Sequence, residues 1–160
     1  MVNSPTQPYR HNTSSTSSDS QLRPLCWETI LLVEDEQCLR TLASVFLSRQ
    51  GYKVLEASRP DEAITISKNH DGDIQLLLTD VTLPGIDGRA LAQQIQKQRA
   101  EIKVLYVSGY PEEILQQLDS ATPDLPFLEK PFTLDGLANK IRELLDSAGR
   151  GTSAAMRAAS

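Results

Sequence analysis

Acidic residues follow two apolar runs directly. "TILLV" is followed by Glu34, Asp35 and Glu36, and "IQLLL" by Thr79 and Asp80. A carboxylate at such a point can complement a helix end or form a turn, and alone neither stretch is specific for a function. Crowded in one cleft, these carboxylates would raise one another's pKa unless a cation neutralised them. A hard divalent ion suits all-oxygen ligands, which makes Mg²⁺ the natural candidate.

Two further polar residues end apolar runs nearer the C-terminus. Ser108 closes "KVLYVS" and Lys130 closes "PFLEK". Their ordinary roles would be a turn residue and a surface cation. Beside a metal-binding carboxylate they could bind phosphoryl oxygens, with an Asp as the nucleophile of acyl-phosphate chemistry. Asp80 is the candidate nucleophile, because an apolar strand precedes it and a bend at Pro84 and Gly85 follows it.

Alternating strands and helices are predicted to position these residues. Apolar runs predict strands over 29–33, 52–57, 74–80, 103–108 and 126–130. Helical spacing predicts helices over 36–49, from Pro60, from Gly88, around Ile114 to Leu118, and from Thr133 as N-cap to about Asp146. Five successive strand–helix units predict an α/β fold with a parallel sheet covered on both faces. The candidate residues should then meet at the carboxyl ends of the strands.

The 160 residues suit one compact domain with spare chain at both ends. Residues 1–26 are rich in Ser, Thr and Pro, which predicts a disordered tail. The domain is expected over 27–146, and 147–160 are expected to form a flexible tail whose alanines could extend a helix. Cys26 and Cys38 are expected to be free thiols, with a bridge between them as the weaker alternative.

Charge and hydropathy argue against two classes of partner. The net charge is −5 and the basic residues are scattered, whereas nucleic-acid binders concentrate them on one face. The apolar runs fall far short of the roughly 18 residues of a membrane span, and the N-terminus lacks the apolar core of a signal peptide. We therefore expect a cytoplasmic protein that binds neither nucleic acid nor membrane.

Four motifs, "ILLVEDE", "LLLTDVTLPGIDG", "YVSGY" and "FLEKPF", together resemble the receiver domain of two-component response regulators. The similarity covers about residues 28–146. It implies a flavodoxin-like, doubly wound fold with five strands in the order 2-1-3-4-5 and five helices. It also implies either a single-domain regulator or the receiver module of a hybrid sensor histidine kinase.

The resemblance implies a role for each candidate residue. Asp80 would be the phosphoacceptor, Asp35 would bind Mg²⁺ directly, and Glu34 would bind it through water. The backbone carbonyl of Thr82 would complete the protein ligands, and Ser108 would move to meet the phosphoryl group. Three further residues complete the implied site: Lys130, which pairs with the phosphoryl group, Pro131, whose peptide bond with Lys130 would be cis, and Phe127, an aromatic switch or an ordinary core residue.

The implied function is a phosphorylation switch. A sensor histidine kinase or a histidine phosphotransfer domain would dock near the first helix and pass a phosphoryl group to Asp80. The surface from the fourth helix through the fifth strand to the last helix would be the readout face and the contact of a homodimer. The chain's own histidines are His11, in the expected tail, and His70, which is expected to be a helix-end cation rather than a donor.

Three alternatives remain open at this point. A phosphatase of the haloacid dehalogenase type would need a second Asp where Thr82 stands. A nucleotide- or flavin-binding protein would need a Gly-rich or Ser/Thr-rich loop after the first strand, where "VEDEQ" puts negative charge. A pseudo-receiver would keep the fold and act through protein contacts alone. No enzymatic turnover is expected beyond self-phosphorylation and loss of that phosphate.

Overall fold

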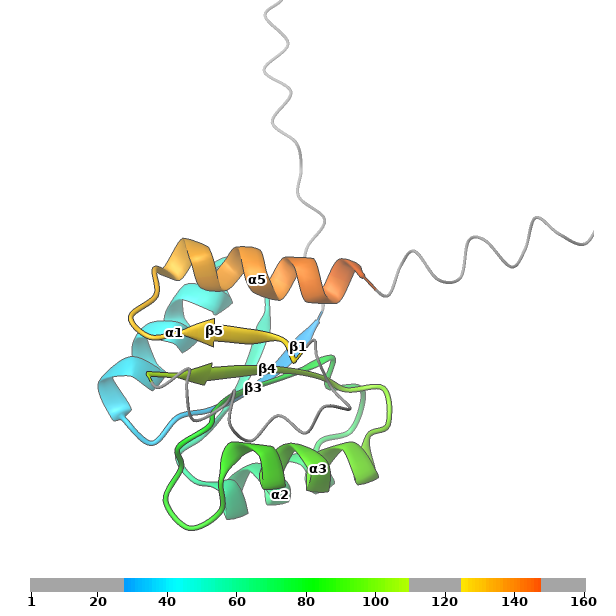
Figure 1. Cartoon of the computed structure of the whole chain (residues 1–160). Coiled ribbons are helices and arrows are strands. Elements are labelled where there is room, and N and C mark those ends of the chain that lie inside the picture. The colour runs from blue at the N-terminus through cyan, green and yellow to red at the C-terminus, as the bar shows by residue number, and fades with distance from the viewer. Residues whose placement is uncertain (1–27, 110–124, 148–160) are drawn as a thin grey trace, which may run out of the picture.

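The computed structural model describes residues 28–109 and 125–147. Within them, five strands form one parallel sheet in the order β2-β1-β3-β4-β5 (Figure 1). The strands are β1 (Thr29–Val33), β2 (Lys53–Ala57), β3 (Leu76–Asp80), β4 (Lys103–Ser108) and β5 (Phe127–Glu129). The helices described are α1 (Gln37–Arg49), α2 (Pro60–Asn69), α3 (Gly88–Gln98) and α5 (Leu134–Asp146). The predicted α/β fold and strand order are confirmed.

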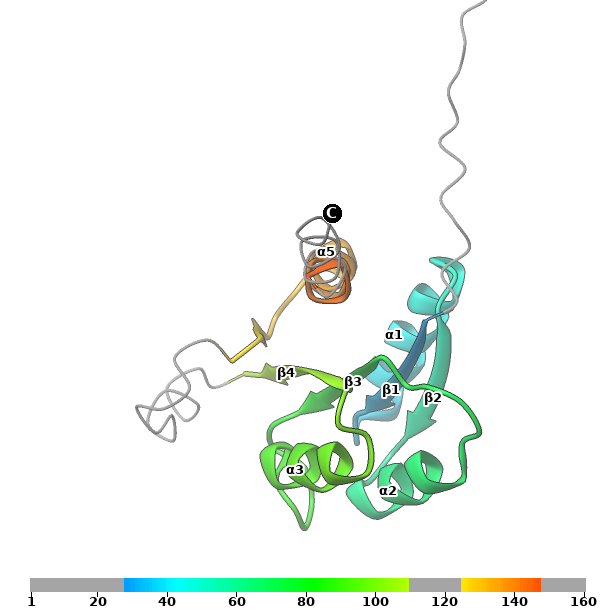
Figure 2. The same ribbon diagram turned by 90° about the vertical axis from the view of Figure 1, so that its right-hand side faces the viewer.

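A helical layer covers each face of the sheet. Helices α1 and α5 lie on one face, and α2 and α3 lie on the other (Figures 1 and 2). Along β1, Ile30 and Leu32 belong to the apolar cluster with α1 and α5, whereas Leu31 and Val33 belong to the cluster with α2 and α3. A strand covered on both faces carries apolar side chains at consecutive positions. This explains why the run "TILLV" does not alternate with polar residues.

Predicted and observed element boundaries differ by two residues at most. The third strand begins at Leu76 rather than at 74, and β5 is confined to Phe127–Glu129. Gln75 nevertheless takes part in backbone pairing, because its N–H donates to the Thr29 carbonyl at 2.9 Å and its carbonyl accepts from the Lys103 N–H at 3.0 Å. The fourth helix, expected around residues 114–118, lies outside the described residues, as do most of both expected tails.

Side-chain caps fix the start of two helices. Thr133 is the N-cap of α5, as predicted, and its Oγ1 accepts a hydrogen bond from the Gly136 N–H at 3.0 Å. Asp87 is the N-cap of α3, and its Oδ1 accepts from the N–H groups of Arg89 and Ala90, each at 2.8 Å. Such caps satisfy backbone donors that have no partner inside the helix.

The C-terminal end of α2 is held by a cation from α3 rather than by its own histidine. The Arg99 guanidinium donates to the backbone carbonyls of Ser67, His70 and Gly72 at distances of 2.6–3.2 Å. Partial burial, together with the nearby charges of Lys53 and Arg99, lowers the pKa of His70. This shift disfavours the imidazolium form, so the helix-end cation expected at His70 stays a prediction, and the carbonyls at this end of α2 accept from Arg99 instead.

Two smaller observations concern the remaining sequence expectations. Cys38 is a free, exposed cysteine on α1, whereas Cys26 lies outside the described residues. Among the helices described, none combines the length and the apolar character needed to cross a lipid bilayer.

Candidate functional site

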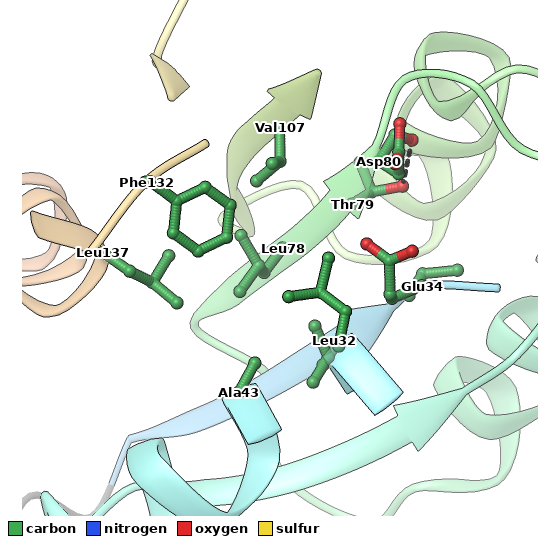
Figure 3. A pocket seen from close by; sticks show the side chains of 11 residues that line it. Leu32, Glu34, Ala43, Leu78, Thr79, Asp80, Val107, Phe132 and Leu137 are labelled. Atoms are coloured by element: carbon green, nitrogen blue, oxygen red, sulfur yellow. Dashed lines mark hydrogen bonds between the residues drawn. The ribbon is translucent and has the colours of Figure 1, made fainter. Parts of the chain in front are cut away.

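A pocket lies where β1 and β3 end, between the sheet and the layer of α1 and α5 (Figure 3). Most of its lining is apolar and includes Leu32, Leu78, Val107, Phe132 and Leu137. Glu34, Thr79 and Asp80 contribute its polar groups. Apolar surroundings lower the local dielectric, so charges beside such a pocket interact more strongly than they would in water.

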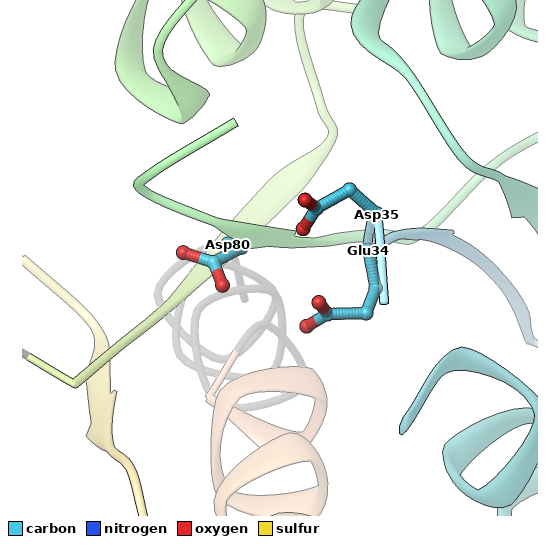
Figure 4. A group of neighbouring side chains, drawn as sticks. All are labelled: Glu34, Asp35 and Asp80. Carbon is cyan, nitrogen blue, oxygen red and sulfur yellow. The ribbon is translucent and has the colours of Figure 1, made fainter. Parts of the chain in front are cut away.

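Three carboxylates gather beside this pocket (Figure 4). Glu34 and Asp35 follow β1 and Asp80 ends β3, and oxygens from the three side chains lie within 4.8 Å of one another. Glu34 is only 5% exposed and Asp80 9%, whereas Asp35 is exposed. Strands β1 and β3 are parallel neighbours, so their carboxyl ends lie side by side. The structure thus brings together the three acids that the sequence predicted to converge.

Both carboxylate oxygens of Asp80 have partners. Oδ2 accepts a hydrogen bond from the Lys130 Nζ at 2.6 Å, and Oδ1 accepts one from the Thr82 N–H at 2.8 Å. The backbone carbonyl of Asp80 accepts from the fully buried Thr79 hydroxyl at 2.9 Å. The strand and these bonds together fix the position of the Asp80 carboxylate.

Gly88 makes room for the backbone of Asp80, a role that sequence analysis did not find. A Cβ added to Gly88 would lie 2.1 Å from the Asp80 carbonyl oxygen and 3.1 Å from the Thr79 Oγ1. The Gly88 N–H donates to the Val81 carbonyl at 2.9 Å, which holds the start of α3 against the end of β3. The only signal in the sequence is a glycine at the first position of a helix, directly after its N-cap.

Burial and charge shift the pKa of two groups in the site. Burial raises the pKa of the Glu34 carboxyl, and its bonds to Lys130 at 3.0 Å and to the Glu36 N–H at 3.2 Å offset this only in part. For Lys130, burial favours the neutral amine, but hydrogen bonds to Asp80 and Glu34 outweigh it and raise the pKa. Lys130 is therefore an ammonium ion that bridges two carboxylates.

The donor set suits a hard divalent cation. The three carboxylates lie together, and the Lys130 ammonium contacts two of them, Glu34 and Asp80. Mg²⁺ binds through one or two carboxylates and keeps several waters, and the exposed side of Asp35 leaves room for them. The acidic cluster is thus consistent with a magnesium site.

The remaining predicted site residues lie close by on the sheet edge. Ser108 ends β4, is 1% exposed, and its carbonyl accepts from the Lys130 N–H at 2.8 Å. The Lys130–Pro131 bond is cis, the geometry expected from the sequence. Phe127 is half-buried and packs against the apolar cluster on the α2–α3 face of the sheet. Thr82 is exposed and contacts Asp80 through its N–H.

Comparisons with known proteins cover this same part of the chain. Residues 30–142 match the family described as "Response regulator receiver domain". The sensor kinase CckA of Brucella abortus (strain 2308) is 36% identical over 118 residues, which are 74% of this chain but only 12% of the kinase. The receiver protein CpdR of the same organism is 30% identical over 119 residues, which are 74% of this chain and 98% of CpdR.

A solved structure supports the same assignment. The response regulator TrrA of Thermotoga maritima, in complex with Mg(2+)-BeF, is 29% identical and superimposes with a TM-score of 0.62. The match covers 73% of this chain and 98% of that one. The topology, the acidic cluster with its lysine and the family match agree, and the chain belongs to the response regulator receiver domain family.

Proposed function

We propose that this protein is a phosphoacceptor of a two-component phosphorelay and that Asp80 receives the phosphoryl group. One observation carries the proposal. The Asp80 carboxylate ends the central strand β3 within hydrogen-bonding distance of the Lys130 ammonium, and the carboxylates of Glu34 and Asp35 lie beside it. An anchored carboxylate in such a site is suited to nucleophilic attack on phosphorus.

The donor would be a phosphohistidine of a sensor histidine kinase or a histidine phosphotransfer domain. An oxygen of Asp80 forms a bond to phosphorus while the bond from phosphorus to the imidazole nitrogen breaks. The electron pair of that bond stays with the imidazole, which takes up a proton from solvent. Lys130 stabilises the negative charge of the transferring group, and the Ser108 hydroxyl binds a phosphoryl oxygen.

The same residues would hold Mg²⁺. Asp80 and Asp35 would bind it directly, Glu34 through water, and the carbonyl of Thr82 would complete the protein ligands. When bound, the ion would neutralise the crowded carboxylates and the charge on the phosphoryl group. TrrA, whose sequence is 29% identical, was solved in complex with Mg(2+)-BeF, which supports this assignment.

Phosphorylation would shift the protein between two surface states. The new charge would draw Ser108 inward, and Phe127 would change its rotamer on the edge of the sheet. The readout face would run from the expected fourth helix, which lies outside the described residues, through β5 to α5, and a homodimer through this face is part of the proposal. The histidine-bearing partner would dock beside α1.

The unit that carries this function is proposed to span residues 27–146, in the cytoplasm. The chain spans 12% of the sensor kinase CckA and 49% of the regulator ResD of Bacillus subtilis (strain 168), but 98% of CpdR. Both a single-domain regulator and a receiver module of a hybrid kinase fit these lengths.

The test is phosphorylation by a small donor. Wild-type protein incubated with Mg²⁺ and acetyl phosphate should gain one phosphoryl group, about 80 Da, in intact mass. Asp80→Ala should gain nothing, because it lacks the nucleophile. Asp73→Ala is a matched control, because Asp73 is exposed and precedes β3 at the opposite edge of the sheet.

Two results of this experiment would contradict the proposal. A gain of mass that persists in Asp80→Ala would assign the phosphoryl group to another residue. No gain in wild-type protein, at a Mg²⁺ concentration that saturates the site, would leave the pseudo-receiver, which acts through protein contacts alone.

A further inference from the structure

We propose that Arg40 is a positioning residue that holds the loop carrying Glu34 and Asp35 in the conformation that binds Mg²⁺. The inference rests on the proposed function, because it concerns the same metal site. It adds a residue that does not touch the ion and that the sequence motifs did not single out.

Arg40 accounts for three consecutive carbonyl groups of this loop. Its Nη1 donates to the Glu34 carbonyl at 2.6 Å and, more weakly, to the Asp35 carbonyl at 3.4 Å. Its backbone N–H donates to the Glu36 carbonyl at 2.9 Å. These three residues form the whole connection between β1, which ends at Val33, and α1. The guanidinium therefore restricts the peptide units that carry the Glu34 and Asp35 carbonyls, whereas the bond to Glu36 is the first backbone bond of α1 and does not depend on the side chain.

Helix α1, like α2, begins without a hydrogen bond from the side chain of its N-cap residue. Its N-cap residue, Glu36, makes no side-chain hydrogen bond to the first turn of α1. By contrast, Asp87 and Thr133 cap α3 and α5 with their side chains. Without a side-chain cap, the chain enters α1 held by the bonds of Arg40 to the Glu34 and Asp35 carbonyls and by the bond from the Glu36 N–H to the Glu34 Oε1.

The guanidinium is itself held in place from the neighbouring strand. Its Nε lies 4.0 Å from the Glu56 Oε2 on β2, and the Glu56 Oε1 accepts from the Ser44 hydroxyl at 2.7 Å. The Arg40 side chain is only 16% exposed. A rigid, multiply bonded guanidinium can orient a loop, whereas an exposed and mobile one could not.

Electrostatics and positioning predict opposite effects, which makes the role testable. Removing a positive charge near a cation site should strengthen Mg²⁺ binding if charge alone mattered. Removing a group that orients the ligand-bearing loop should weaken Mg²⁺ binding, as it does for other residues that hold metal ligands in place. The direction in which Mg²⁺ affinity changes therefore distinguishes a positioning role of Arg40 from a purely electrostatic one.

The experiment measures Mg²⁺ affinity by calorimetry in the full chain for wild type, Arg40→Met and Arg49→Met. We expect the dissociation constant of Arg40→Met to rise about tenfold. Arg49→Met removes the same charge from the exposed end of the same helix and should match wild type. An unchanged or tighter constant in Arg40→Met would overturn the proposal.

Phosphorylation kinetics give a second readout that a general loss of stability would not reproduce. With acetyl phosphate as donor, Arg40→Met should need about ten times more Mg²⁺ for half-maximal rate and reach a near wild-type rate at saturation. A lower rate that added Mg²⁺ does not restore would contradict a positioning role. Should Arg40→Met fail to fold, Arg40→Gln keeps part of the stem without the charge, and wild-type affinity in that variant would equally overturn the proposal.

The two proposals fail in different ways. If wild-type protein binds no Mg²⁺, the magnesium-dependent phosphoacceptor is wrong whatever Arg40 does. If wild-type protein binds Mg²⁺ and accepts phosphate but Arg40→Met behaves identically, only the role of Arg40 is wrong.

Discussion

The smallest scale at which this site is built is the single residue behind Asp80, the proposed nucleophile. Gly88 sits so close to Asp80 that any side chain would meet its carbonyl oxygen. The same carbonyl accepts the hydroxyl of the buried Thr79, so it cannot simply turn away. The position of the Asp80 backbone thus depends on a residue that has no functional group of its own.

Gly88→Ala should therefore disturb both stability and phosphorylation. We expect the free energy of unfolding to fall by about 2 kcal/mol, because a methyl group forced into a packed site displaces its surroundings. Urea titration would measure the loss, and acetyl phosphate would report the slower reaction of the displaced Asp80. Gly109→Ala is the matched control for stability, because an added Cβ there meets no atom of residues 28–109 or 125–147 within 4 Å. Equal stability of the two variants would show that the residues around Gly88 accommodate a methyl group without a loss of stability.

At the scale of elements, one side chain joins the two helices of the lower layer in Figure 1. Arg99, the C-cap residue of α3, satisfies carbonyls at the end of α2 and in the turn that follows it. Carbonyls at a helix end carry partial negative charge and lack partners within the helix. A cation from the neighbouring helix therefore stabilises α2 and fixes its distance from α3 at once.

Arg99→Met should remove this link. We expect a loss of about 2 kcal/mol in the free energy of unfolding, since hydrogen bonds to a charged group contribute more than neutral ones. Hydrogen exchange should quicken at the end of α2 before it does elsewhere. Lys97→Met, a change at an exposed position of α3, is the control and should leave both measurements unchanged. Uniformly faster exchange across the sheet would contradict a local link.

At the scale of the whole molecule, the burial of Glu34 in the site lowers the stability of the fold at neutral pH. The folded state raises the pKa of Glu34 above its usual value because it buries the carboxyl group. Folding therefore favours the protonated form, and stability is lost as pH rises from the unfolded pKa of Glu34 through its folded pKa. Lys130 also loses stability as pH rises, but only in alkaline solution, so at neutral pH its raised pKa stabilises the fold whereas that of Glu34 destabilises it.

Glu34→Gln should accordingly stabilise the metal-free protein at neutral pH. We expect the free energy of unfolding to rise by about 1 kcal/mol, which is typical when a functional residue that destabilises the fold is replaced. The gain should shrink as the pH is lowered toward 4.5, because wild-type Glu34 then becomes neutral as well. Chemical denaturation across this pH range would measure it. A loss of stability at neutral pH would mean that the ion pair with Lys130 outweighs the cost of burial.

Mg²⁺ binding should also change the stability of the folded protein. A ligand that binds only the folded state raises its stability, so wild-type protein should melt at a higher temperature with Mg²⁺. Glu34→Gln should gain less, because one of the three carboxylates is gone. An equal gain in both proteins would exclude Glu34 from the metal site.

Most elements and the placement of the chemical groups could be predicted from the order of the amino acids alone. Consecutive apolar runs such as "TILLV" predicted buried parallel strands, and helical spacing predicted the layers that cover them. Because parallel strands end at one edge of the sheet, the order of the residues along the chain was enough to place Glu34, Asp80 and Lys130 together. Polar residues after apolar runs are a local signal, and local signals can be read from a sequence.

Contacts between residues that are distant along the chain, or that carry no distinctive type, could be seen only in the folded protein. Three contacts depend on side-chain geometry in three dimensions. Gly88 lies close to the Asp80 carbonyl, Arg99 donates hydrogen bonds to the end of α2, and Arg40 donates to the loop before α1. A glycine or a surface arginine is common, and its role depends on what packs against it. The pKa shifts belong to the same class, because burial and the bridge from Lys130 to two carboxylates arise only when β1, β3 and β5 pack into one sheet.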